Sequence, residues 1–340
     1  TSGHPDKICD QISDAILDEY LKQDPKSRVA VETFGSHGSL VIGGEVTSKG
    51  KVDAAKIAKK VYKDIGYPEN LKITARIVRQ SPDIAQGVDT GGAGDQGIMY
   101  GYATDETKEY LPKPLVLAHR LTKGLEILRR SNPKFSWLRP DGKSQVTVKN
   151  GKVKNVLIST QHDEKISQEE IKKLLSEYLI KKVVGYGDYE ILVNPTGKFT
   201  VGGFYADTGL TGRKLMVDTY GGLIPHGGGA FSGKDPTKVD RSGAYMARWV
   251  AKNIVANGYA KKCTVSIAYA IGKAEPLMVE VETFGTGNNQ TARNIILKKF
   301  DFRPLAIIET LNLRRPIYQK TAAYGHFGRT EFPWEKIIKI

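Results

Sequence analysis

Hydrophobic residues recur along the chain at two spacings, which predict alternating helices and strands. Ile8, Ile12 and Ile16 stand four apart and predict a helix over 8–21, for which Asp6 is the expected N-cap. By the same spacing we expect helices over 52–65, 115–130, 168–180 and 242–257. Short runs of β-branched and aromatic residues predict strands over 28–34, 39–46, 71–78, 145–149, 153–159, 264–270 and 277–284.

Turn residues divide these elements and indicate the fold class. Asn150-Gly151 between two predicted strands is typical of a tight hairpin, and Ser167 with Glu170 predicts a capped helix start. Strands that are neighbours in sequence, with helices between the hairpins, favour an α+β fold over a doubly wound parallel sheet. The stretch 87–101 is rich in glycine and shows no periodicity, so no element is predicted there.

One pentapeptide occurs twice. Val31-Glu32-Thr33-Phe34-Gly35 returns unchanged at residues 281–285, and both copies fall on predicted strands downstream of a helix. We interpret the repetition as a trace of duplicated α+β units.

Composition narrows the class of protein. The 340 residues suit two or three domains, and two cysteines exclude a disulfide framework, so reduced thiols in the cytoplasm are expected. No apolar run reaches the length of a membrane span. Because the chain opens at Thr1 without a methionine, we expect that a few residues precede it.

The formal net charge is +14, from 51 Lys and Arg against 37 Asp and Glu. Such a charge suits a polyanionic partner, which includes nucleic acid, a membrane surface or a phosphorylated small molecule. The basic residues are scattered without a block of five, so most are expected on solvated faces.

The sequence matches two familiar nucleotide-binding motifs, but neither match has the structural context that the motif requires. Residues 92–97 match G-x-G-x-x-G, but they follow a loop and contain Asp95, which would repel a pyrophosphate. Residues 228–234 match G-x-x-x-x-G-K, yet Asp235 stands where a P-loop needs Ser or Thr. We therefore reject both a Rossmann site and a P-loop fold.

Three clusters combine glycines, carboxylates and cations. Residues 3–7 place His4, Asp6 and Lys7 at a helix start, where Asp6 could hold Mg²⁺ while His4 and Lys7 face phosphate oxygens. Residues 207–214 join two glycines to adjacent cations, and residues 226–240 add a run of three glycines and a fourth glycine with two lysines and two aspartates. Taken singly, each cluster is also compatible with a structural turn or cap; together they predict a Mg²⁺-dependent enzyme acting on a nucleoside triphosphate.

These clusters, with residues 92–97, 218–222 and 324–335, resemble S-adenosylmethionine synthetase over nearly the whole chain. The resemblance implies an enzyme that joins ATP and L-methionine and then hydrolyses the triphosphate to pyrophosphate and phosphate, with Mg²⁺, two ions per site, and K⁺. It also implies three similar α+β units with mixed or antiparallel sheets and helices on one face, which we assign to residues 1–100, 101–200 and 201–340, with segments exchanged between units. The expected assembly is a homodimer or homotetramer whose active sites lie between two subunits.

The resemblance also carries roles for individual residues. It implies that His4, Lys143, Arg213 and Lys234 act in catalysis by clamping the triphosphate, together with Lys214. Asp141, Lys198, Phe199, Asp207 and Ala230 are expected around the nucleotide, and Glu45, Gln86, Asp207 and Lys238 around methionine. Asp6 and Asp240 are the implied Mg²⁺ ligands and Glu32 the implied K⁺ ligand.

The chain departs from the family pattern at one place. About ten residues usually separate the segment that ends at Asp89 from Gly92, and here there are two. We expect either a shortened loop or residues left out of this numbering, and a lid over 86–92 that is disordered or absent.

Other interpretations remain. The charge alone would also suit a nucleic-acid-binding protein, but no basic patch interleaved with aromatic residues supports one. A kinase would use the same triphosphate chemistry and release ADP, and an inactive relative would lack site residues, which this sequence retains. We expect neither a nucleic-acid nor a membrane partner.

Overall fold

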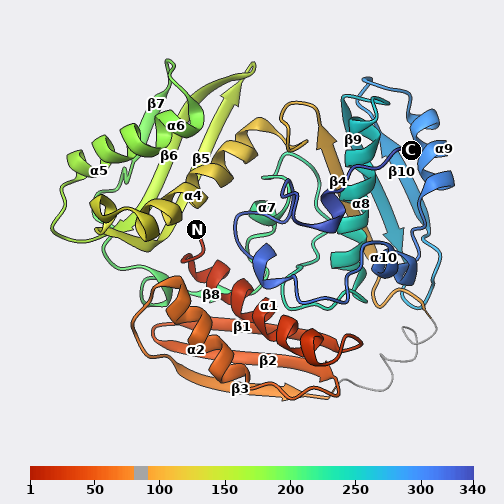
Figure 1. The fold of residues 1–340 in the computed structure, drawn as a ribbon, viewed down its shortest axis with the longest axis horizontal. Coiled ribbons are helices and arrows are strands. Elements are labelled where there is room, and N and C mark those ends of the chain that lie inside the picture. Colours follow the sequence, from red (N-terminus) through yellow and green to blue (C-terminus); the bar gives the residue numbers. More distant parts are fainter. Residues whose placement is uncertain (80–90) are drawn as a thin grey trace.

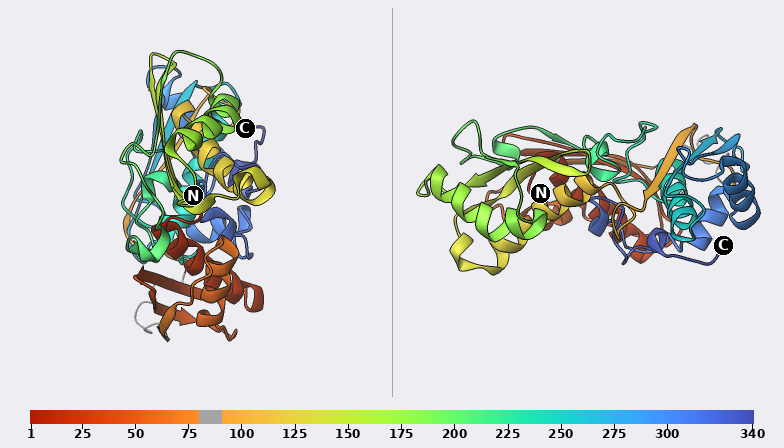
Figure 2. Two further views of the ribbon diagram at one scale, coloured as in Figure 1. Left: turned by 90° about the vertical axis from the view of Figure 1, so that its left-hand side faces the viewer. Right: turned by 90° about the horizontal axis from the view of Figure 1, so that it is seen from above.

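The computed structural model describes residues 1–79 and 91–340, and it contains three sheets, each covered by helices on one face (Figure 1). The predicted α+β class with three similar units is therefore confirmed. Figure 2 shows a flat molecule in which the helices lie toward one broad side and the strands toward the other.

The first unit holds the N-terminal residues. Helices α1 (Pro5–Gln23) and α2 (Ala54–Ile65) pack on one face of the sheet β3-β2-β1-β8. Its strands are β1 (Arg28–Ser36), β2 (Ser39–Thr47), β3 (Lys72–Val78) and the short β8 (Gly209–Leu210), which comes from far along the chain. Strand β1 runs antiparallel to both β2 and β8, so residues 209–210 lie beside the start of the chain.

The second unit is continuous in sequence. Strands β5 (Leu138–Lys149), β6 (Lys152–His162) and β7 (Glu190–Val193) form its sheet, and α4 (Lys113–Ser131), α5 (Gln168–Leu175) and α6 (Lys181–Val184) complete it. The predicted hairpin turn is confirmed, since Asn150 and Gly151 both have positive φ. The predicted helix over 168–180 is interrupted after Leu175 by a π-helical turn over Ser176–Ile180.

The third unit joins distant segments. Its sheet has the order β10-β9-β4, with β4 (Gly97–Thr104), β9 (Lys262–Tyr269) and β10 (Met278–Glu282). The long buried helix α8 (Val239–Ala256) packs against β4 and β9, and α10 (Pro304–Thr310) lies against α8. Helix α9 (Asn289–Lys299) packs on β10. The short helix α7 (Leu215–Asp218) belongs to the loop before α8. Strand β4 begins in the stretch 87–101, for which we expected no element, and extends beyond it. The sequence did not reveal this strand because its glycines hide the alternation of apolar and polar residues.

Gly101 explains why glycine stands inside β4. A β-carbon at Gly101 would lie 1.9 Å from the backbone carbon of Ala247, so the strand and helix α8 touch backbone to backbone. The motif 92–97 leads into this strand and not into a helix, which agrees with the rejection of a Rossmann site.

Two local predictions were wrong. The N-cap of α1 is His4 and not Asp6, because Pro5 occupies the first helical position and the His4 Nδ1 accepts the Asp6 amide at 3.2 Å. Helix α8 begins at Val239, before the expected Ser242, whose hydroxyl instead donates to the Lys238 carbonyl.

The repeated pentapeptide does not mark equivalent strands. Its first copy lies in β1, directly after a helix, whereas the second spans the end of β10 and the turn beyond it, one strand later in its unit. The duplicated units are real, but this repeat is not the evidence for them.

Candidate active site

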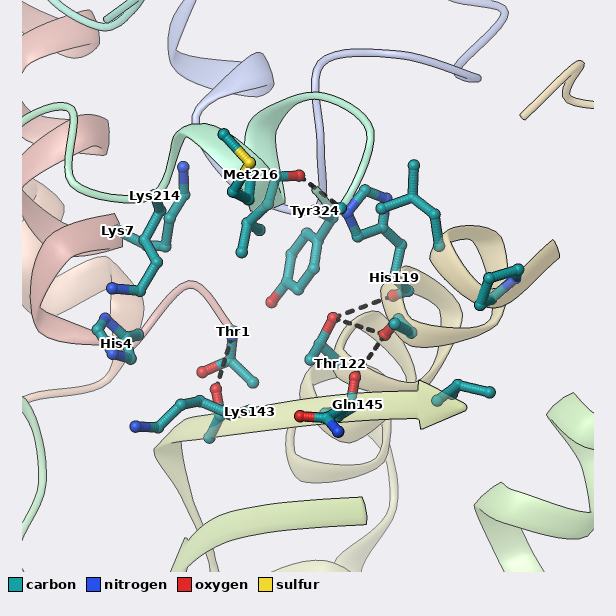
Figure 3. Close-up of a pocket in the computed structure, with 18 of the residues that line it drawn as sticks. Thr1, His4, Lys7, His119, Thr122, Lys143, Gln145, Lys214, Met216 and Tyr324 are labelled. Atoms are coloured by element: carbon teal, nitrogen blue, oxygen red, sulfur yellow. Dashed lines mark hydrogen bonds between the residues drawn. The ribbon is translucent and has the colours of Figure 1, made fainter. Parts of the chain in front are cut away.

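The cavity that carries the candidate site lies between the first two units and the α7 loop. It has a volume of about 500 Å³ and is lined by helix α4, strand β5, the α7 segment and the first residues of the chain (Figure 3). Three of the residues to which the resemblance gave a role line it, namely His4, Lys143 and Lys214, and Lys7 from the first cluster lines it as well. Figure 3 shows their nitrogens at one end of the cavity, and His119 and Thr122 at the other.

Lys143 is the most available cation in this group. It lies on β5, it is exposed, and no hydrogen bond or ion pair of its ammonium group is found among the described residues. The ammonium group therefore remains available for an anion inside the cavity.

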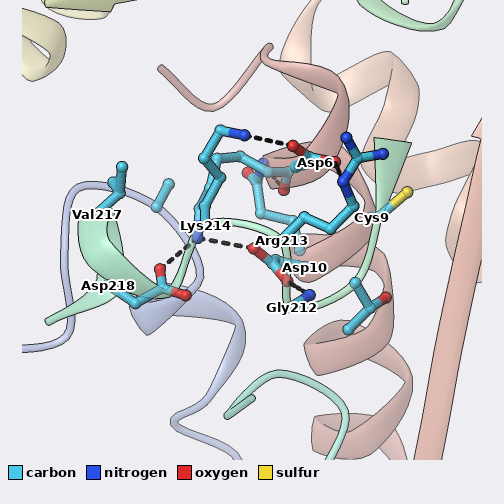
Figure 4. Close-up of polar contacts among 12 residues, drawn as sticks. Asp6, Cys9, Asp10, Gly212, Arg213, Lys214, Val217 and Asp218 are labelled. Atoms are coloured by element: carbon cyan, nitrogen blue, oxygen red, sulfur yellow. Dashed lines mark hydrogen bonds and ion pairs between the residues drawn. The ribbon is translucent and has the colours of Figure 1, made fainter. Parts of the chain in front are cut away.

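Asp6 is the central carboxylate of the first cluster (Figure 4). It is 2% exposed, and it accepts from the Lys214 ammonium at 2.5 Å and from the Leu210 amide at 3.0 Å, while the Arg213 Nε lies 3.7 Å away. Burial opposes ionisation of this carboxyl, but the hydrogen bonds from Lys214 and Leu210 outweigh it and hold the pKa of Asp6 below its usual value.

His4 is a neutral imidazole in this setting. Burial and the nearby ammonium of Lys214 lower the pKa of His4 to about 3. A neutral ring can donate one hydrogen bond to an anionic group without carrying a formal charge.

Lys7 does not have the role that the sequence predicted. Its ammonium binds Asp10 at 2.8 Å and Asp218 at 2.5 Å, and all three side chains are buried. Because two carboxylates already neutralise it, Lys7 is a structural cation at the wall of the cavity and is not available to phosphate oxygens.

The predicted nucleotide residues lie at the edge between the first two units. The Asp141 carboxylate is 4% exposed and accepts the Gly203 amide at 3.0 Å, and burial raises its pKa. Phe199 is half-buried and its backbone amide donates to the His162 ring, whereas Lys198 and Asp207 are exposed.

The remaining predicted residues are held in a second group beside the other end of β1. Lys234 forms an isolated bridge to Ala30 and binds Asp240 at 2.5 Å, while Lys238 binds the buried Asp235. Leu210, which contacts Asp6, pairs instead with Phe34. Ala30 and Phe34 are four residue steps apart, which corresponds to about 13 Å along the strand, so one chain keeps the two groups apart.

Three further predicted residues complete the inventory. Glu32 is exposed on β1 and Glu45 is half-buried on the adjacent β2, on the sheet face opposite α1 and α2. Ala230 stands against Gly212, where a β-carbon would come within 2.5 Å of the Ala230 side chain. Gln86 and most of the predicted lid over 86–92 lie outside the described residues.

Sequence reasoning missed several residues that organise the site. Asp10, Asp14 and Arg241 are fully buried, and Asp14 binds Arg241 through both carboxylate oxygens, at 2.7 and 2.8 Å. The available signal was the spacing of Asp6, Asp10, Asp14 and Asp18, which recur every four residues on a helix that also carries Ile8, Ile12 and Ile16 at the same spacing.

Fold and site together define an α+β enzyme of three units with a cationic cavity for a polyanionic substrate. Three family models match the chain in succession: the N-terminal domain of S-adenosylmethionine synthetase over residues 1–85, the central domain over 90–199 and the C-terminal domain over 201–336. The chain belongs to the S-adenosylmethionine synthetase family.

Similar proteins carry the matching name. The S-adenosylmethionine synthase of Sorangium cellulosum is 52% identical, over 99% of this chain and 86% of that protein. The S-adenosylmethionine synthase of Petrotoga mobilis is 50% identical over all of this chain and 95% of its own, and that of Clostridium tetani is 50% identical over all of this chain and 96% of its own.

Proposed function

We propose that the cationic end of this cavity is where this S-adenosylmethionine synthetase holds ATP while L-methionine attacks it. The observation that carries the proposal is the convergence of Lys143, Lys214 and the neutral His4 on one cavity. The methionine thioether attacks the ribose C5′, the C5′–O bond breaks, and triphosphate leaves with the bonding electrons. S-adenosylmethionine is released, and water then cleaves the triphosphate to pyrophosphate and phosphate.

The residues suit this reaction because it needs no general base. A neutral sulfur becomes a sulfonium cation, so the barrier depends on neutralising the departing triphosphate and on aligning sulfur, carbon and oxygen. We assign triphosphate binding to His4, Lys143, Arg213 and Lys214 from one chain and to Lys234 from the second group. Arg213 is exposed beside Asp6 and is free to turn toward an anion, which suits a role in the hydrolytic step.

Nucleotide and methionine recognition are assigned to the flanking residues. We place adenine against Phe199, with Lys198, Asp141, Asp207 and Ala230 around the nucleotide. Methionine is assigned to Glu45, Gln86, Asp207 and Lys238, whose opposite charges suit an amino acid zwitterion.

The donor set fits Mg²⁺ that arrives with phosphates. Among the described residues, no group of three His, Cys, Asp or Glu side chains is arranged to hold a metal. Mg²⁺ is commonly bound by one or two carboxylates plus substrate phosphates and water, and Asp6 and Asp240 each offer one such carboxylate, bound by a lysine here. We propose these two as Mg²⁺ ligands, which would add charge neutralisation at the triphosphate, and Glu32 as a ligand of K⁺.

A second copy of the chain would bring the two separated groups together. The sheet face of the first unit opposite α1 and α2 exposes Phe34, Val41 and Val78 by 45–48%, which is unusual for three large apolar residues on one face. We propose a homodimer that covers these faces and places the Lys234 group of one copy against the His4 group of the other. Pairing of such dimers would give the tetramer.

The cytoplasm is the compartment that we propose, because the two cysteines are free and buried. Among the described residues, no helix is long and apolar enough to cross a membrane.

A product assay tests the proposed function. The purified protein is incubated with ATP, L-methionine, Mg²⁺ and K⁺, and the products are identified by mass spectrometry. S-adenosylmethionine with pyrophosphate and phosphate, formed only when methionine is present, is the expected result. ADP would indicate a kinase, and the absence of turnover would contradict the proposal. Omitting Mg²⁺ and K⁺ in turn tests each cation.

A further inference from the structure

Four aspartates form a row along α1, and each accepts backbone amides from a distant loop. Asp6, Asp10, Asp14 and Asp18 are spaced by four residues, so they follow one stripe of the helix. The Leu210 amide donates to Asp6 at 3.0 Å, the Gly212 amide to Asp10 at 2.9 Å and the Gly233 amide to Asp14 at 2.8 Å. Asp18 accepts the Tyr318 and Gln319 amides, both at 2.9 Å.

Asp10 and Asp14 are the two fully buried members of the row. Each is 0% exposed and each has a buried cation, which is Lys7 for Asp10 and Arg241 for Asp14. Burying a carboxylate is costly unless cations and hydrogen-bond donors surround it. Both aspartates satisfy this condition partly through a loop amide, so the conformation of that loop is tied to helix α1.

The loop after Asp207 depends on Asp10. Beyond the two residues of β8 it has no regular structure until α7, and Gly212 adopts a left-handed conformation with φ of 79°. The Gly212 amide is fixed by Asp10 directly before Arg213 and Lys214, the two cations of this loop (Figure 4). Lys7 adds a second restraint, because it bridges Asp10 to Asp218 at the end of α7.

The loop before α8 depends on Asp14 in the same way. Asp14 accepts the Gly233 amide, and its partner Arg241 donates to the carbonyls of Phe231 at 3.0 Å and Lys234 at 3.2 Å. Gly233 approaches β1 so closely that a β-carbon would lie 1.9 Å from the Val31 carbonyl oxygen. Asp14 and Arg241 therefore fix the backbone on both sides of Lys234.

We propose that Asp10 and Asp14 are positioning residues for the reaction, which set the places of Arg213 and Lys214 and of Lys234. This inference rests on the proposed function of those cations. Asp18 also accepts loop amides on the same helix, but it is half-buried, no ion pair of its carboxylate is found among the described residues, and the segment that it holds carries none of the assigned site residues. It provides an internal control for the loss of such amide contacts.

The test compares Asp10→Asn, Asp14→Asn and Asp18→Asn in the full chain. We expect Asp10→Asn and Asp14→Asn to lower kcat by about 100-fold, because a displacement near 1 Å at a reacting centre has that effect. The KM for methionine should change by less than about threefold, and Asp18→Asn should keep kcat within about twofold of the unchanged protein.

Amide hydrogen exchange distinguishes a local loosening of one loop from a general loss of stability, which would accelerate exchange throughout the protein. Exchange should accelerate selectively over 209–214 in Asp10→Asn, over 226–238 in Asp14→Asn and over 317–320 in Asp18→Asn. Equal kcat values in Asp10→Asn and Asp18→Asn, or a loss of kcat without faster exchange in the assigned loop, would overturn the inference.

The experiment distinguishes failure of this inference from a failure to fold and from a failure of the proposed function. If Asp14→Asn does not fold, because Arg241 is left without its carboxylate, the comparison of Asp10→Asn with Asp18→Asn decides; Asp10→Asn leaves Lys7 paired with Asp218. If the unchanged protein makes no S-adenosylmethionine, the proposed function fails, while the exchange pattern alone still shows whether each aspartate holds its loop.

Discussion

At the scale of single residues, the site is governed by which charges are already paired. Lys7, Lys214, Lys234 and Lys238 each contact a carboxylate, whereas no hydrogen bond or ion pair of Lys143 is found among the described residues, although the charge of Asp141 acts on it. A cation without an ion pair can bind an incoming anion without first breaking an existing ion pair. Lys143 should therefore bind the substrate phosphates most directly.

Replacing Lys143 with methionine tests this directly. Met keeps the aliphatic stem and removes the charge, so kcat/KM for ATP should fall by about 100-fold or more, with little change in thermal stability because no internal ion pair is lost. Lys149→Met, at the far end of the same strand β5, is the control and should leave kcat/KM unchanged. Steady-state kinetics at varied ATP would show whether the two variants differ; similar values would remove Lys143 from the site.

The burial of His326 leads to a prediction of how the free energy of unfolding depends on pH. It is 0% exposed, and burial together with the nearby Arg241 holds its pKa well below 6.5; the Tyr245 hydroxyl and Asp218 also face the ring. Below about pH 6.5 the unfolded chain binds a proton at this residue that the folded chain does not. The free energy of unfolding should therefore fall on acidification, by up to about 1.4 kcal/mol per pH unit.

Thermal unfolding between pH 7 and pH 5 measures this effect. The melting temperature of His326→Asn should fall less steeply with decreasing pH than that of the unchanged protein. The control is His37→Asn, since His37 is exposed and at a positive φ that asparagine tolerates. Parallel pH profiles for the unchanged protein and His326→Asn would show that another group causes the acid sensitivity.

At the scale of elements, contact between backbones fixes how α8 lies on its sheet. Gly101 allows β4 to touch the helix at Ala247. Strand β4 precedes α8 by more than a hundred residues, whereas β9 and β10 follow it, so the sheet joins distant parts of the sequence. Since Lys238 is the N-cap residue of α8 and Asp240 lies in its first turn, the packing of this helix places part of the second group of proposed site residues.

Gly101→Ala should separate β4 from α8 and destabilise the fold by about 3 kcal/mol. Its matched control is Gly187→Ala, in an exposed loop where a β-carbon would meet only the Tyr189 ring at 3.3 Å. Chemical denaturation compares the two variants. A Gly101→Ala protein as stable as the control would mean that strand and helix move apart at little cost.

At the scale of the whole molecule, one chain keeps two groups of proposed site residues apart. The His4 group and the Lys234 group lie beside β1 at points about 13 Å apart along the strand, and the uncovered sheet faces carry exposed apolar residues. The homodimer that we propose, in which a second copy completes the site, would account for both observations.

Complementation between two inactive variants tests the shared site. Lys214→Met and Lys234→Met should each be inactive alone, because each damages every site of its own dimer. When the two are co-expressed in equal amounts, half of the dimers are mixed, and each mixed dimer carries one intact site. About a quarter of the unchanged activity should then return. No recovery, with mixed dimers demonstrated by mass spectrometry, would mean that each site is built within one chain.

The sequence by itself determined the α+β class, the helices and hairpins whose periodicity is local, and the family. The Asn150-Gly151 turn and the Ser167 cap were readable because each depends on residues within a few positions. The boundaries at residues 100 and 200 and the individual site roles stay predictions. Strand β4 could not be predicted from the sequence because its glycines hid the alternation. The His4 cap was missed because Pro5 shifted the helix start. The pairing of Lys7 was missed because one of its partners, Asp218, is far away in the sequence.

Only the tertiary structure decided which charges meet. Asp10 and Asp14 appear in the sequence as ordinary polar positions of a helix, and their partners lie about 200 residues away, at Gly212, Gly233 and Arg241. Burial removes water from these carboxylates, so each must find donors from the chain, and the donors nearest in space include loop amides beside the cations that we propose for catalysis. Which amides those are depends on how the three units pack, which no local pattern encodes.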